Sequence, residues 1–335
     1  MTKKNIFCTN IAKRVNDLSK FWPLYQHGNS IRCVCRNNRK SAFGVKKESL
    51  QGNNPQKHYK VFLFPCLSMV YTVSAFGFEI APDLQEQLDV LRSERIDYVE
   101  FRGAYDRWLL DFNKTEIREI SHLIKENGIR VSSVASPVGK HDVREAFNTD
   151  DFKRSLEYAC ILNSPNLRIF SFFIPPEREP STYKDEIFGR LENMAAVASA
   201  YPIRLCHENE PGTFGENLER SLEIYNHFPN LRAVFDPANF VRSSSDPLKC
   251  LTMLREVIAY FHIKDVSRES GKYVIAGDGD AKIKQILNEM KHEERMLFLS
   301  LEPSLGDSVQ GKRRISGPEK FRKHSAALRK ILSEL

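Results

Sequence analysis

From residue 70 onward, short apolar runs alternate with longer amphipathic stretches. The runs are rich in Val, Ile, Phe and Leu, which is typical of parallel strands buried on both faces. We predict eight such strands: Tyr71–Phe76, Tyr98–Arg102, Arg130–Val134, Leu167–Phe172, Arg204–His207, Ala233–Phe235, Tyr260–Ile263 and Leu297–Leu301. Between them, apolar residues recur at helical spacing, as at Leu84, Leu88 and Leu91. Eight strand–helix units in about 265 residues predict an α/β fold of the (β/α)8 type, a TIM barrel.

An open, doubly wound sheet would show the same alternation of strands and helices. Such folds usually carry a glycine-rich turn after the first strand, where a dinucleotide phosphate binds. Here the corresponding segment Ser74–Gly77 contains a single glycine, so the dinucleotide fingerprint is missing. No P-loop and no G-x-S-x-G nucleophile elbow occurs either. The barrel is therefore the preferred architecture.

The segment 1–68 differs in composition from the rest of the chain. The net charge of +7 at pH 7 is typical of nucleic-acid-binding proteins. However, thirteen basic and two acidic residues fall within positions 1–70, and the remaining chain has a net charge of −4. The segment has no regular apolar period, so we expect a basic, poorly ordered extension, dispensable or spurious, before a barrel at 69–335. The alternative is a basic nucleic-acid-binding arm.

The sequence offers no candidate for a membrane-spanning helix, because no stretch approaches the roughly 20 apolar residues that one requires. In the barrel segment, Cys160, Cys206 and Cys250 occur singly within patterned runs. Isolated thiols of this kind are typical of proteins in a reducing compartment. We therefore expect a cytoplasmic location and no membrane partner.

Acidic residues and a histidine follow the last four predicted strands. Active sites of (β/α)8 barrels lie where the strands end, at the carboxyl-terminal rim. Four residues are expected there: Glu208, Asp236, His262 and Glu302. Three carboxylates and an imidazole suit one divalent cation, Mn²⁺ or Mg²⁺ before Co²⁺ or Zn²⁺. Without a cation the carboxylates would repel one another, so a metal is the simplest resolution.

Five short motifs surround these positions: H-E-N-E-P-G (207–212), F-D-P-A-N (235–239), H-I-K-D-V-S-R (262–268), G-D-G (277–279) and L-E-P (301–303). With them, the segment 72–303 resembles the xylose isomerase-like barrel superfamily of sugar isomerases, sugar phosphate isomerases/epimerases and endonuclease IV. The resemblance implies that the four residues above bind the metal. It also implies that Glu208 and Glu302 flank the substrate carbon and transfer protons, and that Arg268 binds the substrate.

The expected function is a metal-dependent sugar or sugar-phosphate isomerase or epimerase that acts through an enediolate. Lys264, Asn239 and Glu210 lie in the same motifs and are predicted to contact the substrate with Arg268. Lys264 is also the basic residue nearest the site for an alternative hydride-shift mechanism. The expected partner is a small-molecule sugar or sugar phosphate, and a homodimer is compatible with the sequence.

Two other activities occur on this scaffold. An inosose-type dehydratase would share the first proton abstraction and then expel hydroxide. An endonuclease IV-like enzyme is disfavoured, because Asn239 stands where the enzymes with three zinc ions carry a histidine. The net negative charge of the barrel segment also argues against a nucleic-acid partner.

Several further residues have two interpretations. Glu100 and Arg102 share one face of a strand, where they either line the barrel mouth or form a buried ion pair. Lys312–Arg314, after the last strand, would hold a phosphate or carboxylate of the substrate if the run is functional. Asp265 is expected to orient the neighbouring ligands or to cap a helix. His207 alternates away from Glu208 and is expected to be packed rather than catalytic.

Overall fold

The computed structural model describes residues 25–27, 30–33, 42–46, 60–64, 71–305 and 316–335. The chain divides into two compact units, 1–69 and 70–335. In the first unit, four short strands pair in order as an antiparallel sheet: β1 (Tyr25–His27), β2 (Ser30–Cys33), β3 (Ala42–Lys46) and β4 (Lys60–Phe64). The sequence pattern predicts no strand there. The rest of 1–68, which the expectation of poor order concerns, lies outside the described residues.

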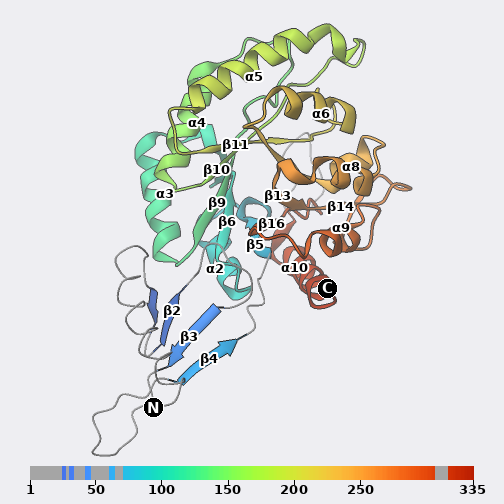
Figure 1. Ribbon diagram of the computed structural model, residues 1–335. Coiled ribbons are helices and arrows are strands. Elements are labelled where there is room, and N and C mark those ends of the chain that lie inside the picture. The colour runs from blue at the N-terminus through green and yellow to red at the C-terminus, as the bar shows by residue number, and fades with distance from the viewer. Residues whose placement is uncertain (1–24, 28–29, 34–41, 47–59, 65–70, 306–315) are drawn as a thin grey trace, which may run out of the picture. The chain divides into compact units, whose positions relative to one another are not determined.

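The second unit is a closed barrel of eight parallel strands (Figure 1). The strands are β5 (Tyr71–Phe76), β6 (Tyr98–Phe101), β9 (Arg130–Ala135), β10 (Asn166–Ile169), β11 (Arg204–Glu208), β12 (Arg232–Phe235), β13 (Ile258–Ile263) and β16 (Leu297–Leu301). The last strand pairs with the first, from Leu297 opposite Tyr71 to Leu301 opposite Ala75. This closure confirms the predicted TIM barrel and excludes an open sheet.

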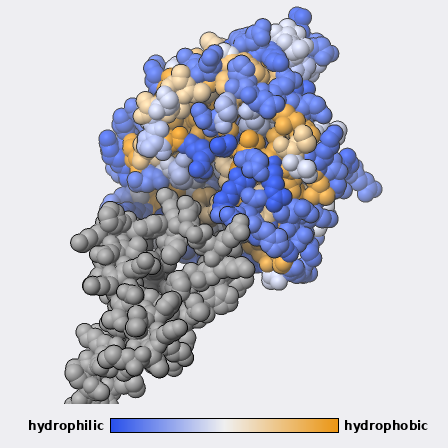
Figure 2. Space-filling view, viewed as in Figure 1, coloured by the Kyte–Doolittle hydropathy of each residue, from blue (hydrophilic) through white to orange (hydrophobic). Residues whose placement is uncertain are grey.

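Helices surround the barrel, and hydrophilic side chains cover much of the face in view (Figures 1 and 2). The helices are α2 (Leu84–Ser93), α3 (Lys114–Glu126), α4 (Thr149–Ile161), α5 (Lys184–Ala198), α6 (Leu218–His227), α7 (Pro237–Arg242), α8 (Pro247–Leu254), α9 (Ile283–Met290) and α10 (Gly317–Ser333). The connection after β12 thus holds two short helices, α7 and α8. None of the helices in the described part of the chain is long and apolar enough to cross a bilayer.

The loops contain short strands and 3₁₀ helices. They are the strands β7 (Gly103–Ala104), β8 (Arg107–Trp108), β14 (Asp265–Val266) and β15 (Tyr273–Val274), and the 3₁₀ helices η1 (Gly77–Glu79), η2 (Leu109–Asp111), η3 (Pro180–Tyr183) and η4 (Arg255–Val257). The helix ends follow their sequence signals. Asn113 and Glu116 form a capping box at the start of α3, and Gly128 follows that helix with a φ of +72°.

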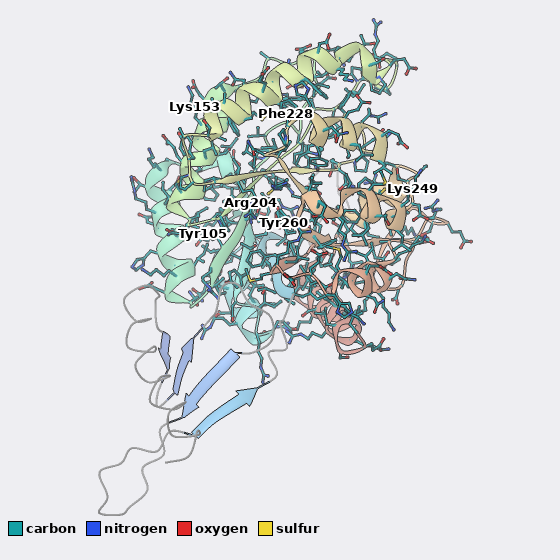
Figure 3. All side chains as sticks on the ribbon, in the orientation of Figure 1. Tyr105, Lys153, Arg204, Phe228, Lys249 and Tyr260 are labelled. Carbon is teal, nitrogen blue, oxygen red and sulfur yellow. The ribbon has the colours of Figure 1, made fainter. Side chains whose placement is uncertain are left out.

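The inner face of the barrel has an apolar layer beneath a polar one. The apolar layer is a buried cluster of inward-facing side chains: Cys206, Val234, Tyr260 and Phe298. Figure 3 labels Tyr260 among the strands, whereas Lys153 and Lys249 lie on outer helices. Because side chains alternate along a strand, the residues two or four positions further on face inward again at the rim. The predicted metal ligands occupy those positions.

Candidate metal centre

Four buried residues meet at the rim of the barrel: Glu208, Asp236, His262 and Glu302. One ligand atom from each lies within 4.8 Å of the others, and we call this group the four-residue cluster. Glu208 ends β11, His262 lies in β13 and Glu302 directly follows β16. Asp236 precedes α7 and accepts a hydrogen bond from the backbone N–H of Asn239. None of the four is more than 7% exposed, so the cluster is shielded from bulk water.

His262 is oriented so that one ring nitrogen faces the cluster centre. Its Nδ1 lies 3.1, 3.4 and 3.7 Å from one oxygen of each of the three carboxylates. Its Nε2 lies 3.3 Å from Oε1 of Glu100, which also accepts a 2.9 Å hydrogen bond from the Tyr260 hydroxyl. A carboxylate that holds the outer nitrogen of a histidine leaves the inner nitrogen free to bind a metal. This arrangement fits a metal-ligating histidine.

An arginine holds the outer oxygen of each of two cluster carboxylates. Nη1 of Arg168 lies 3.0 Å from Oε2 of Glu208, and Nη1 of Arg102 lies 3.1 Å from Oε1 of Glu302. Arg102 also binds Glu79 at 2.9 Å and stacks 4.7 Å over the ring of Phe76. The second oxygen of each glutamate faces the cluster centre, 3.1 and 3.4 Å from His262.

Lys264 brings a third cation to the cluster. Its Nζ lies 2.7 Å from Oδ2 of Asp236 and 3.2 Å from Oε2 of Glu302. The contact with Asp236 is close but not aligned as a hydrogen bond, so this buried oxygen accepts none from the described residues. A buried carboxylate oxygen that is paired with a cation, rather than with a neutral hydrogen-bond donor, is suited to hold a metal ion. The donor set and this oxygen together fit a divalent metal.

Charges within the cluster determine which groups are ionised. Burial raises the pKa of Glu208, but His262 and Arg168 hold that pKa well below its usual value. Burial also raises the pKa of Glu302, yet Lys264 and His262 bring it down to about 2. Burial lowers the pKa of His262, whereas Glu208 and Glu100 raise it well above its ordinary value. Both glutamates are therefore carboxylates at neutral pH.

Two of the predicted substrate contacts, Asn239 and Glu210, lie beside the cluster. Nδ2 of Asn239 lies 3.2 Å from Oε1 of Glu208 and 3.5 Å from Oε2 of Glu210. Oδ1 of Asn239 is buried and has no hydrogen-bond partner among the described residues. Lys140 binds the other oxygen of Glu210 at 2.9 Å, and both side chains are partly exposed. Asn239 therefore lies buried between Glu208 and the partly exposed pair of Glu210 and Lys140, which forms the outer edge of the site.

The structure does not bring Arg268 to the cluster. Arg268 is exposed in the turn between β14 and β15, where its backbone N–H binds Asp280. Its side chain makes no hydrogen bond or ion pair with another described residue. The basic run Lys312–Arg314 lies outside the described residues.

Three charged residues of the site, Arg168, Glu79 and Lys140, were not predicted from the sequence. Arg168 stands between Leu167 and Ile169 in a fully buried strand. A buried arginine needs an acidic partner. That signal could have identified it. Glu100 is fully buried and Arg102 is mostly buried. They do not pair with each other: Glu100 pairs with His262, and Arg102 pairs with Glu302 and Glu79.

Two neighbouring residues have structural roles. The ring of His207 lies within hydrogen-bonding distance of Ser171 and Tyr225, and burial lowers its pKa to about 4. It is therefore neutral and packed, as its position in the strand predicts. Asp265 accepts hydrogen bonds from four backbone N–H groups of its own loop region: Val266, Gly277, Gly279 and Ala281. It thus organises the loop after β15.

No curated protein matches the sequence. Among solved structures, the IOLI protein with a bound zinc atom is 15% identical with a TM-score of 0.64, covering 78% of this chain and 98% of its own. The 3-keto-D-glucoside 4-epimerase YcjR from E. coli is 13% identical with a TM-score of 0.59, covering 79% and 100%. The probable 3-DHS dehydratase AsbF from Bacillus anthracis is 14% identical with a TM-score of 0.60, covering 77% and 98%. These likenesses establish a shared fold.

A sequence family described as xylose isomerase-like TIM barrel matches residues 88–331. That range contains all four residues of the cluster and seven of the eight barrel strands. The chain belongs to the xylose isomerase-like TIM barrel family.

Proposed function

We propose that the chain is a divalent-metal-dependent sugar or sugar-phosphate isomerase or epimerase. The observation that carries this proposal is the pair of glutamates, Glu208 and Glu302. Each is ionised, each has its outer oxygen fixed by an arginine, and each turns its other oxygen to one point beside His262. Epimerisation next to a carbonyl uses two such groups on opposite faces of the carbon, and isomerisation uses at least one, which removes a proton and returns it to the neighbouring carbon.

The four-residue cluster would hold the metal, for which Mn²⁺ or Mg²⁺ suits the oxygen-rich donor set. When bound, the cation would supply positive charge that stabilises an enediolate formed from the substrate. Glu100 would hold His262 in the orientation that presents Nδ1 to the cluster centre.

In the proposed reaction, Glu302 removes the proton from the carbon beside the carbonyl. In an isomerisation, the protonated Glu302 gives that proton to the neighbouring carbon. In an epimerisation, Glu208 first takes up a proton from solvent and delivers it to the opposite face, and Glu302 later releases its proton to solvent. Arg102 and Arg168 keep their own protons, because guanidinium groups remain charged in proteins, and they fix the outer carboxylate oxygens. The two glutamates are therefore restrained as well as ionised, which keeps the reacting groups in position.

Four residues would bind the substrate: Asn239, Glu210, Lys264 and Arg268. The free Oδ1 of Asn239 can accept a hydrogen bond from a sugar hydroxyl, and Glu210 can accept another. Arg268 is exposed in its turn and would contact the far end of the substrate, where a phosphate would sit in a sugar phosphate.

The dehydratase is the second candidate, and one observation keeps it in consideration. The ammonium of Lys264 lies 3.2 Å from Glu302 inside the site, where it could protonate a departing hydroxyl group. An endonuclease remains the least supported reading, because Asn239 replaces the histidine expected by resemblance. The carboxamide of Asn239 also donates a hydrogen bond to Glu208.

Incubation with ketoses and their phosphates in D₂O, with added Mn²⁺, separates these activities. We expect deuterium at carbon with all hydroxyls retained, observed by NMR. Glu302→Gln and Glu208→Gln should each lower this exchange at least about 100-fold, whereas Glu289→Gln, an exposed change on α9, should leave it intact. A dehydrated product would instead establish the lyase. Cleavage of abasic DNA without deuterium exchange would overturn the proposal.

A further inference from the structure

Lys264 is more deeply buried than a lysine usually is. It follows β13 two positions after His262, so the alternation of side chains places it on the same inner face of the barrel. It is only 4% exposed. A buried lysine requires a negatively charged partner, and the residues that surround Lys264 are those of the four-residue cluster.

The lysine contacts the oxygens that face the cluster centre. Its Nζ lies 2.7 Å from Oδ2 of Asp236 and 3.2 Å from Oε2 of Glu302. The same two oxygens lie 3.7 and 3.4 Å from Nδ1 of His262. The ammonium therefore contacts two of the ligand atoms through which a metal would be held.

A metal and this ammonium would compete for the same oxygens. The Lys264 ammonium forms ion pairs with both Asp236 and Glu302, through oxygens that a metal would also need. Two cations in contact with the same oxygens repel strongly where little water is present to screen them. One of them has to leave when the other binds.

We propose that Lys264 is a built-in competitor for the metal. Without metal, its ammonium neutralises Asp236 and Glu302, and the cation binds by displacing it. This inference rests on the metal site of the proposed function. Nζ also lies 5.7 Å from the centre of the Tyr273 ring, a cation–π contact that the ammonium can keep when it leaves the two carboxylates. The barrel is then stable without metal, and its metal affinity is weaker than the four ligands alone would give.

The test is calorimetric titration of the full chain with Mn²⁺, comparing the wild type with Lys264→Met. Methionine has a similar length and no charge. We expect Lys264→Met to bind Mn²⁺ about tenfold more tightly or better, because the competing charge is gone. Its Tm without metal should fall below that of the wild type, and Mn²⁺ should raise its Tm by a larger amount. Lys153→Met is the matched control, because Lys153 is exposed on α4 and contacts no residue of the site, and its Mn²⁺ affinity should equal that of the wild type.

A second variant covers the case in which Lys264→Met does not fold without metal. Lys264→Gln is neutral but can still donate hydrogen bonds to the carboxylates, and it should also bind Mn²⁺ more tightly than the wild type. Equal or weaker Mn²⁺ binding by the folded variants would overturn the competitor role and leave the metal site intact. Absence of Mn²⁺ binding in the wild type and in both variants would overturn the metal site itself, and the proposed function with it.

Discussion

Nη1 of Arg168 lies 3.0 Å from Oε2 of Glu208, and both side chains are buried. The two residues come from neighbouring strands, β10 and β11, whose register aligns Arg168 with Cys206, two positions before the glutamate. This ion pair fixes which oxygen of Glu208 remains for the cluster. It also makes the charge of Glu208 tolerable in a site that water scarcely reaches.

Replacing this arginine should destabilise the barrel. Arg168→Met leaves the carboxylate of Glu208 buried without its guanidinium, and breaking a buried pair from one side costs about 3–5 kcal/mol. Urea unfolding at pH 7 measures the loss. Arg204→Met, on the exposed start of β11, should change the free energy of unfolding by no more than about 0.5 kcal/mol.

The same prediction can be checked by a double substitution. Glu208→Gln removes the negative charge, so adding Arg168→Met should then cost much less than it does in the wild type. Equal costs in the two backgrounds would contradict the ion-pair explanation.

Asp265 should determine the order of the loop that follows β15. Its two oxygens accept four backbone hydrogen bonds of 2.8–3.1 Å, from Val266, Gly277, Gly279 and Ala281. Asp265→Asn replaces one oxygen with an NH₂ group, which cannot accept, so two N–H groups lose their partner. Each loss costs about 1–3 kcal/mol, and we expect a fall of about 2–5 kcal/mol in the free energy of unfolding.

Hydrogen exchange gives a local check of this loop. The amides of Gly277 and Gly279 should exchange faster in Asp265→Asn than in the wild type. Asp278→Asn, an exposed change in the same loop, should leave both the exchange rates and the unfolding midpoint unchanged. Unaltered exchange in Asp265→Asn would show that other contacts hold the loop.

Deletion of residues 1–68 should leave a folded barrel. All eight barrel strands and the four-residue cluster lie between positions 71 and 302. The barrel closes by pairing β16 with β5, so no strand from the first unit is required. We expect circular dichroism, Tm and Mn²⁺ binding close to those of the full chain. Loss of folding or of metal binding would show that the segment is part of the functional unit.

The barrel and the cluster could be predicted because both depend on local rules. Apolar runs mark the strands, and the rim of a (β/α)8 barrel collects the residues that follow them. From those rules alone, the sequence predicts that Glu208, Asp236, His262 and Glu302 lie together at the rim. Four short strands of the first unit, three to five residues long, escaped prediction because they lie in a polar, basic segment without the repeating strand–helix pattern of the barrel.

The ion pairs around the cluster could not be predicted, since their partners are distant in sequence. Arg102 binds Glu302 across 200 positions, and only the closure of the barrel brings them together. Lys264 and Arg268 both follow His262 in the sequence, but only Lys264 reaches the four-residue cluster. The alternation of side chains along a strand predicts that Lys264 faces the barrel interior. Arg268 lies after β14 in a turn, and the sequence does not predict the direction of a side chain there.

His324 should make the stability of the barrel depend on pH. The imidazole lies on α10 and is fully buried. Nδ1 accepts a 3.3 Å hydrogen bond from the N–H of Ala276, so Nε2 carries the proton and donates to the carbonyl of Ile263 at 3.0 Å. Burial lowers the pKa of His324 to about 4, although the bond to Ile263 opposes this shift. The folded protein therefore holds this ring neutral where the unfolded chain, with a pKa of about 6.5, takes up a proton.

The sign of the effect follows from that difference. Above about pH 6.5 the ring is neutral in both states, and its contribution to stability is complete. As the pH falls from about 6.5 to 4, only the unfolded chain gains the proton, so the free energy of unfolding decreases by about 3 kcal/mol. Urea unfolding of His324→Gln across this range should show a smaller decrease than the wild type, while the exposed His292→Gln should match the wild type. A pH dependence that is the same in all three proteins would mean that His324 does not stay neutral in the fold.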